Sequence, residues 1–226
     1  LDTSRGLGDV YKRQDYISDG EMSKISYATY IKDRIDGFSG ESERRAPADL
    51  DDFPEYKEKI AKSGGTPTYS RPCCTNALKI KDKDSLNKDL ENFKNSLDKN
   101  NHQKAFMNAA SPGVINVFMP NRFYKTDDEY LHKLSEIMAI EYETITKSNI
   151  QVQLDCPDLA LARHMNFKEL SEQEFLKRAE IQIECLNEAL TNVDVNMTRM
   201  HICWGNYEGP HTCLLYTSPS PRDVSR

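Results

Sequence analysis

Apolar residues recur at helical spacing in three stretches of the chain, and each stretch is followed by a short run in which apolar residues dominate or alternate with polar ones. The helically spaced sets are Leu86, Leu90, Phe93 and Leu97; Leu131, Leu134, Met138, Tyr142 and Ile145; and Phe175, Ala179, Ile183, Leu186 and Leu190. The second and third sets follow Thr126 with Glu129 and Ser171 with Glu174, and both pairs have the form of a capping box. The pattern predicts three amphipathic helices.

Strands are predicted between and after these helices. The runs 105–110, 150–154 and 198–204 are short and apolar or alternating, and the second stops before Pro157, which cannot donate a ladder hydrogen bond. An order of strand, loop, helix and strand is typical of right-handed parallel βαβ units. The sequence therefore predicts an α/β fold with a parallel sheet.

A long excursion interrupts this alternation at about 36–72. Its segments 36–52 and 61–72 are polar, charged and rich in Gly, Pro and Ser. Long excursions after a strand commonly contribute to the rim of an active site, and we expect the same here.

The two ends of the chain do not read as protein of the same origin. Segments 4–14 and 213–223 can be back-translated to the two strands of one oligonucleotide and resemble a translated sequencing adapter. We therefore expect 1–14 and 213–226 to be non-native, 15–212 to be the native part, and the chain to be a fragment.

Charge and cysteine usage limit the class of partner. The formal net charge is −6 and no cluster of Lys and Arg occurs, which disfavours nucleic acid and membrane surfaces and favours small molecules. No apolar run approaches the ~18 residues that span a bilayer.

The cysteines of 15–212 are odd in number and lack framework spacing, so a reducing, cytoplasmic location is predicted. They are Cys73, Cys74, Cys156, Cys185 and Cys203. Cys185, close to the apolar stripe of its helix, is expected to be an ordinary buried thiol.

Candidate chemistry gathers where predicted strands end. His201 and Cys203 are two residues apart in an extended run, so their side chains leave the same face, and imidazole nitrogen with thiolate sulfur favours zinc. Asp155 follows another strand, and Asp19 with Glu21 follows a third. In a (β/α)8 barrel such groups converge on one mouth, so the pattern predicts a metal or active site there.

Four blocks of sequence resemble the cobalamin-independent methionine synthase family, most closely its short bacterial branch, which corresponds to the catalytic half of the long enzymes. The blocks are DGEMSK from Asp19, FMNAASPG from Phe106, VQLDCPDLA from Val152 with RH from Arg163, and HICWGNYEGPH from His201. The resemblance covers nearly all of 15–212.

The resemblance implies a TIM barrel, here incomplete because the first and last βα units are missing. It implies zinc held by His201 and Cys203, with a glutamate and a second cysteine that would lie beyond Thr212. Asp155 takes the place of the aspartate that holds the amino acid substrate, and Glu21 and Asp19 belong to a further substrate block. The family's general acid is a later histidine, so no catalytic residue is assigned within the fragment.

The implied function is zinc-dependent transfer of a methyl group from a methylated folate-type donor to a thiol, converting homocysteine to methionine, with zinc activating the thiol as thiolate. Two alternatives stay open among enzymes: another zinc-thiol alkyltransferase such as an epoxide:thiol transferase, and a metal-independent barrel decarboxylase. A third is that the fragment is inactive because its site is incomplete, and we expect no turnover from the fragment itself. The sequence predicts no oligomeric state.

Overall fold

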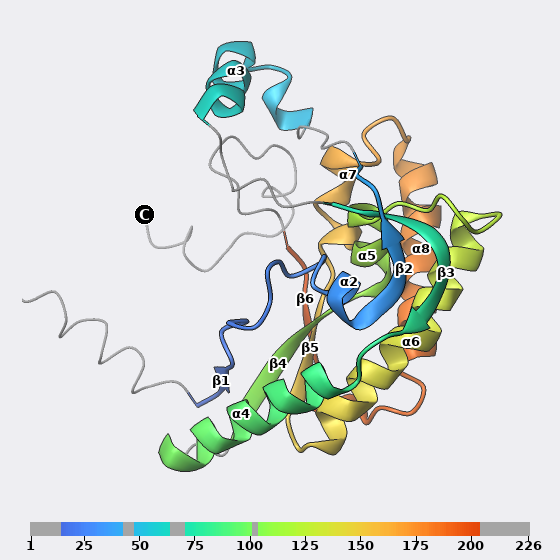
Figure 1. The fold of residues 1–226 in the computed structure, drawn as a ribbon. Helices are drawn as coiled ribbons and strands as arrows, with labels where there is room; N and C mark the ends of the chain where they lie inside the picture. The colour runs from blue at the N-terminus through green and yellow to red at the C-terminus, as the bar shows by residue number, and fades with distance from the viewer. Residues whose placement is uncertain (1–14, 43–47, 64–70, 101–103, 204–226) are drawn as a thin grey trace, which may run out of the picture.

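A parallel four-stranded sheet organises the protein. The computed structural model describes residues 15–42, 48–63, 71–100 and 104–203. Within them the strand order is β1-β4-β5-β6, and every neighbouring pair is parallel (Figure 1). The strands are β1 (Ile17–Ser18), β4 (Ala105–Ala110), β5 (Gln151–Asp155) and β6 (Thr198–His201).

Helices cover one face of this sheet. They are α4 (Asp84–Asn100), α5 (Pro112–Phe118), α6 (Asp127–Lys147), α7 (Ala162–Met165) and α8 (Glu172–Ala189). Helices α5, α6 and α8 pack against one another, and α6 also contacts β4 and β5 (Figure 1). The side chains of Val152 and Leu154 are buried on this face, as are Met107 and Ala109 of β4. The parallel α/β fold predicted from the sequence is confirmed, and it is consistent with part of an α/β barrel.

The helix starts are those that the capping pattern predicts. Thr126 Oγ1 accepts a hydrogen bond from the Glu129 amide at 3.1 Å, and α6 begins directly after Thr126, at Asp127. At α8 the box is complete, because the Ser171 side chain accepts from the Glu174 amide and the Glu174 carboxylate accepts from the Ser171 amide at 2.9 Å. These contacts satisfy amides that have no partner within the helix.

One predicted core position is wrong. Ile183 is 42% exposed, whereas Gln182 and Cys185 of the same helix are buried. The buried stripe of α8 is therefore rotated relative to the predicted one, because α6 and α5 contact the side of α8 that carries Gln182 and Cys185. The expected burial of Cys185 is confirmed.

A separate two-stranded antiparallel sheet lies beside the helices. Strand β2 (Ile35–Ser39) follows α2 (Ile31–Arg34) and pairs with β3 (Cys73–Ile80). The excursion expected at about 36–72 begins inside β2 and ends just before β3. It holds a 3₁₀ helix (Ala48–Leu50) and α3 (Pro54–Ser63), with α3 at one extremity of the view in Figure 1. Two further 3₁₀ helices are Pro157–Leu159 and Val195–Met197.

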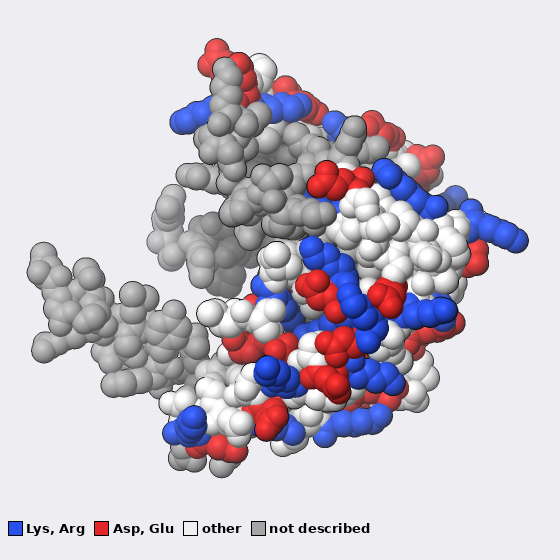
Figure 2. All heavy atoms as spheres, in the orientation of Figure 1, with Lys and Arg blue, Asp and Glu red and all other residues white. Residues whose placement is uncertain are grey.

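The surface and the helices bear on the predicted partners. Acidic and basic side chains are interspersed on the face shown in Figure 2, with no large area of positive charge in that view. None of the helices in the described ranges combines the length and apolarity that crossing a bilayer requires. The segments interpreted as adapter, 1–14 and 213–226, lie outside the described residues.

Candidate functional site

The carboxyl ends of β4, β5 and β6 meet at one edge of the sheet. Asp155 is the last residue of β5 and pairs in register with His201, the last residue of β6. The Cys156 amide donates to the His201 carbonyl at 2.9 Å, and the Ser111 amide donates to the Asp155 carbonyl at 3.1 Å. These bonds hold the strand ends in register, as parallel pairing requires.

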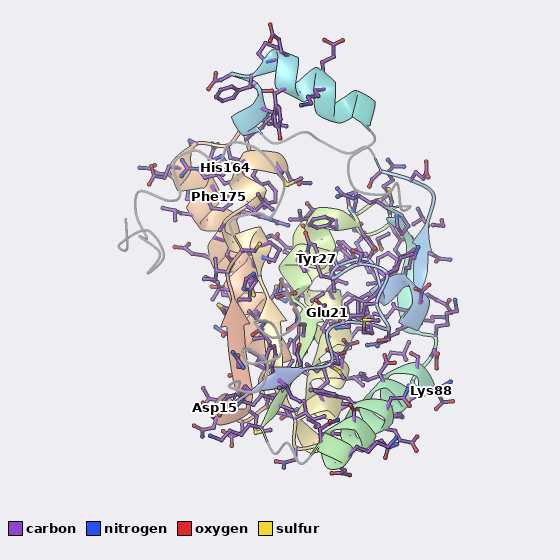
Figure 3. All side chains as sticks on the ribbon, turned by 90° about the vertical axis from the view of Figure 1, so that its left-hand side faces the viewer. Asp15, Glu21, Tyr27, Lys88, His164 and Phe175 are labelled. Atoms are coloured by element: carbon purple, nitrogen blue, oxygen red, sulfur yellow. The ribbon has the colours of Figure 1, made fainter. Side chains whose placement is uncertain are left out.

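Alternation along the strands places polar side chains on the face that the helices leave uncovered. Asn108 pairs in register with Gln153, and the Gln153 side-chain amide donates to Asn108 Oδ1 at 2.9 Å. Because side chains alternate, Asp155 shares the face of Gln153, and His201 shares that of Arg199. Figure 3 is turned so that this side of the molecule faces the viewer.

A cavity of about 230 Å³ opens on this face at the strand ends. Four of the five residues predicted from the sequence line it, and Glu21 and Tyr27 mark it in Figure 3. The lining residues are Glu21, Tyr27, Asn108, Gln153, Asp155, Pro157, Leu161, His201 and Cys203. Asn108 and Gln153 were not predicted as site residues, although their alternation with buried apolar residues was the available signal.

Glu21 reaches the cavity through a tight loop after β1. Gly20 and Glu21 both have left-handed backbone, with φ of 66° and 54°, and the Glu21 amide donates to Asp19 Oδ1 at 3.2 Å. A non-glycine residue in this region costs free energy, and such strain is concentrated at functional sites. Asp19 therefore supports the loop, while Glu21 faces the cavity.

Lys24 brings a buried positive charge to this group of carboxylates. Its side chain is only 2% exposed, and its Nζ lies 3.7 Å from Glu21 Oε1 and 4.5 Å from the Tyr30 ring centre. The ammonium group also donates to the Asn108 carbonyl. It partly offsets the negative charge around the cavity, because an ion in this position is poorly screened by water.

Burial is the main cause of the raised pKa values of Asp155 and Asp19. Desolvation, with a smaller contribution from the negative charge of Glu21, raises the pKa of Asp155 to about 6, against the opposing effects of His201 and Lys24. Desolvation also raises the pKa of Asp19, and the charge of Lys24 opposes it. Asp155 is thus poised to change its charge near neutral pH.

The donor set at the cavity fits part of a zinc site. His201 and Cys203 both line the cavity and could supply nitrogen and sulfur, but the strand predicted over 198–204 ends at His201, so Cys203 lies in the segment after β6. Among the described residues, these two belong to no group of three or more His, Cys, Asp or Glu donors whose ligand atoms all lie within 4.8 Å of one another. One group of three such donors does occur in the described ranges, between α6 and α8, and it shares no residue with this cavity.

A buried carboxyl group stands just behind the cavity. Ser111 Oγ donates to Asp158 Oδ1 at 2.7 Å and accepts from the Val114 amide at 3.0 Å, which caps α5. A Cβ at Gly113 would lie 2.0 Å from Asp158 Oδ2, so no side chain fits there. Burial raises the pKa of Asp158 to about 6. The Ser-Pro-Gly sequence after β4 is therefore explained by packing against Asp158.

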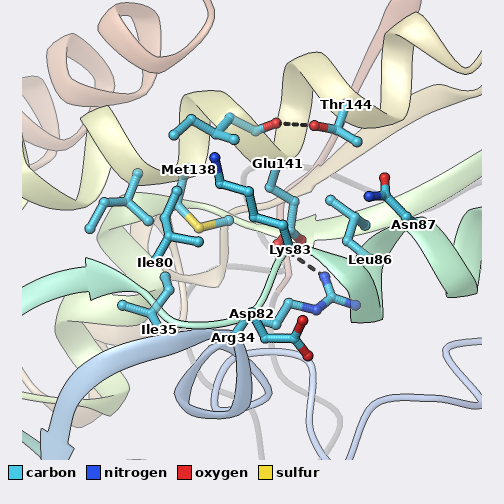
Figure 4. Close-up of a pocket in the computed structure, with 12 residues that line it drawn as sticks. Arg34, Ile35, Ile80, Asp82, Lys83, Leu86, Asn87, Met138, Glu141 and Thr144 are labelled. Carbon is cyan, nitrogen blue, oxygen red and sulfur yellow. Dashed lines mark hydrogen bonds and ion pairs between the residues drawn. The ribbon is translucent and has the colours of Figure 1, made fainter.

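A second cavity, of about 220 Å³, lies between the β2–β3 sheet and the helices α4 and α6 (Figure 4). Its charged wall is a paired network: Arg34 contacts Glu141 at 3.0 Å and Asp89 at 2.7 Å, and the Tyr30 hydroxyl donates to Glu141 at 2.5 Å. Since each of these charges is engaged by a partner, the network is suited to joining α2 to α4 and α6.

Comparison with known proteins supports the fold. The chain is similar to a B12-independent methionine synthase from Shewanella sp. W3-18-1, solved in complex with selenomethionine, with a TM-score of 0.58 and 18% sequence identity. The alignment covers 88% of this chain and 49% of the synthase, so the chain spans about half the length of that protein. No protein-family profile matches the sequence, and no curated protein matches it.

Proposed function

We propose that this chain carries part of the catalytic domain of a zinc-dependent methyltransferase, which moves a methyl group from a methylated folate-type donor to the thiol of homocysteine. The observation that carries the proposal is the single cavity lined by Glu21, Asp155, His201 and Cys203 at the ends of parallel strands. Such strand ends form the active-site mouth of (β/α)8 barrels. The B12-independent methionine synthase of similar fold supports the choice of reaction.

His201 and Cys203 would hold the zinc ion. Bound zinc stabilises a thiol as thiolate, which makes it a strong nucleophile near neutral pH. Two ligands do not complete a tetrahedral site, so the remaining ligands would come from outside the described residues. The barrel would likewise be closed by strands other than the four described.

Asp155 and Glu21 would bind the ammonium group of the amino acid substrate. Their mutual repulsion contributes to the raised pKa of Asp155, and a bound cation would relieve it. Asp19 would act indirectly by holding the Glu21 loop. With a pKa of about 6, Asp155 is ionised above pH 7 and protonated at pH 5, so binding should weaken as the solution is acidified.

The test is calorimetric titration of the full chain with L-homocysteine, with and without zinc. We expect zinc-dependent binding that His201→Ala abolishes. Asp155→Asn should weaken it by ~tenfold or more, as loss of a charged hydrogen bond does. Asp158→Asn is the matched control, because it removes a buried carboxylate that does not line the cavity.

A thiol without an ammonium group, such as 3-mercaptopropionate, separates the alternatives. Under the proposal, Asp155→Asn leaves the binding of 3-mercaptopropionate unchanged. Equal binding of both thiols, insensitive to Asp155→Asn, would favour an epoxide:thiol transferase type of enzyme. Thiol binding that needs no zinc and survives His201→Ala would overturn the proposal.

A further inference from the structure

Three metal-binding side chains meet on the outer surface of the helical layer. His132 comes from α6, and Cys185 and Glu188 come from α8. His132 Nδ1 lies 2.8 Å from Glu188 Oε2 and 3.8 Å from Cys185 Sγ, and one donor atom of each residue lies within 4.8 Å of the others. None of the three lines the cavity at the strand ends.

The packing of the two helices creates this arrangement. Residues three apart share a helix face, so Cys185 and Glu188 both point toward α6. Helices α6 and α8 pack along their length, and His132 lies one turn into α6. Cys185 is fully buried, whereas the side chains of His132 and Glu188 are each 52% exposed. The sulfur thus forms the floor of a site that solvent can reach.

The distances suit a small divalent ion. Zinc bonds of ~2.0–2.3 Å in a tetrahedron separate neighbouring ligand atoms by roughly 3.3–3.7 Å. The His132–Cys185 distance is already close to this, and the His132–Glu188 pair needs to open by only about 0.5 Å by the same geometry. Both side chains of that pair are half exposed and have room to move.

A simple ion pair between His132 and Glu188 does not explain why Cys185 lies beside them. A half-exposed His–Glu pair contributes little to stability and has no need of a cysteine beneath it. Imidazole, thiolate and carboxylate together match zinc better than the harder cations, which prefer oxygen ligands alone. The charges of a thiolate and a carboxylate balance those of a divalent cation.

We propose that His132, Cys185 and Glu188 bind a divalent transition-metal ion, with zinc the best match, and that a water molecule completes the coordination. The ion links α6 to α8 on the surface opposite the active-site cavity. Its binding displaces the Cys185 proton and the hydrogen bond between His132 and Glu188.

The test uses Co²⁺ as a spectroscopic probe with the full chain. The parent carries His201→Ala and Cys203→Ser, so that the proposed catalytic ligands cannot contribute. We expect one Co²⁺ per chain with a thiolate-to-cobalt charge-transfer band and tetrahedral d–d absorption. In this parent, Cys185→Ser should eliminate the band and weaken Co²⁺ binding by well over tenfold, since loss of even an outer partner of a ligand costs ~10–100-fold.

Cys156→Ser is the matched control, because Cys156 is also fully buried but lies directly after β5, outside the proposed site between α6 and α8. It should leave the band and the affinity unchanged. His132→Gln changes a half-exposed position and so tests the site even if Cys185→Ser fails to fold. It should weaken binding at least ~tenfold by the same reasoning.

A parent without the thiolate band, or a band that persists in Cys185→Ser, would overturn this inference. Neither result would contradict the proposed function, which rests on His201 and Cys203. Conversely, zinc-independent thiol binding at the cavity would leave the site between α6 and α8 intact.

Discussion

The two faces of the four-stranded sheet differ sharply in chemistry, and strand β5 contributes to both. Leu154 is buried beneath the helices, while its neighbours Gln153 and Asp155 line the cavity on the opposite face. A five-residue strand therefore serves the core and the candidate site at once, because successive side chains point in opposite directions. Substitutions at neighbouring positions should separate stability from ligand binding.

Leu154→Ala should have the largest effect on stability. Truncating a buried leucine removes apolar contact and leaves a cavity, so we expect a loss of about 2–5 kcal/mol in the free energy of unfolding. Urea denaturation followed by circular dichroism measures it. A loss below about 1 kcal/mol would mean that Leu154 is not part of a tightly packed core, contrary to its burial.

Asp158→Asn should change how stability depends on pH. The pKa of Asp158 in the folded state is about 6, above its ordinary value of 3.8, so the folded protein binds the proton more tightly than the unfolded chain does. Stability from this group is present at low pH and is lost as pH rises through about 6, by at most about 3 kcal/mol. The asparagine cannot titrate, so denaturation midpoints between pH 4 and pH 7.5 should fall less steeply than in the parent. Equal slopes would contradict the raised pKa.

Tyr142→Phe tests a contact that joins the two faces. The buried Tyr142 hydroxyl of α6 donates to the Ala110 carbonyl at 2.6 Å, at the end of β4 beside the cavity. Its loss leaves a buried carbonyl without this donor, so we expect about 1–3 kcal/mol of destabilisation in thermal or urea unfolding. Tyr124→Phe offers a comparison at a less buried hydroxyl, because the Tyr124 hydroxyl accepts a hydrogen bond from the Leu78 amide of β3, which belongs to the two-stranded sheet. If neither variant lowers the free energy of unfolding measurably, the hydrogen bond from Tyr142 to Ala110 does not stabilise the end of β4.

Gln153→Ala should have the smallest effect on stability. It removes one partly buried hydrogen bond to Asn108, worth about 0.5–1.5 kcal/mol. Because Gln153 lines the cavity, the larger change should appear in L-homocysteine binding measured by calorimetry. A Gln153→Ala chain as unstable as Leu154→Ala would remove the distinction between the two faces.

Local signals explain how much of the molecule could be predicted. The capping residues Thr126 and Ser171 and the alternation of β5 lie within a few residues of the structure they specify, and these elements are where the sequence places them. The pairing of β2 with β3 joins residues 35–39 to 73–80 across a long excursion. No local pattern encodes that pairing, so it was not predicted.

The candidate site likewise contains residues that the sequence reveals and residues that only the tertiary structure brings together. His201 and Cys203 are recognisable because residues two apart in an extended run share a side, although β6 itself ends at His201 and Cys203 lies after it. Lys24 and Asn108 join the site only through packing between distant segments, and the group of His132 with Cys185 depends on how α6 meets α8. Such contacts require the tertiary structure.

Zinc-edge X-ray absorption of the zinc-loaded chain can identify the ligand atoms at the cavity. The starting variant is Cys185→Ser, so that the proposed site between α6 and α8 contributes no sulfur. We expect nitrogen and sulfur ligands, loss of one sulfur in Cys203→Ser, and gain of one sulfur when L-homocysteine is added. A spectrum that neither Cys203→Ser nor L-homocysteine changes would contradict the assignment of this cavity as a zinc-thiol site.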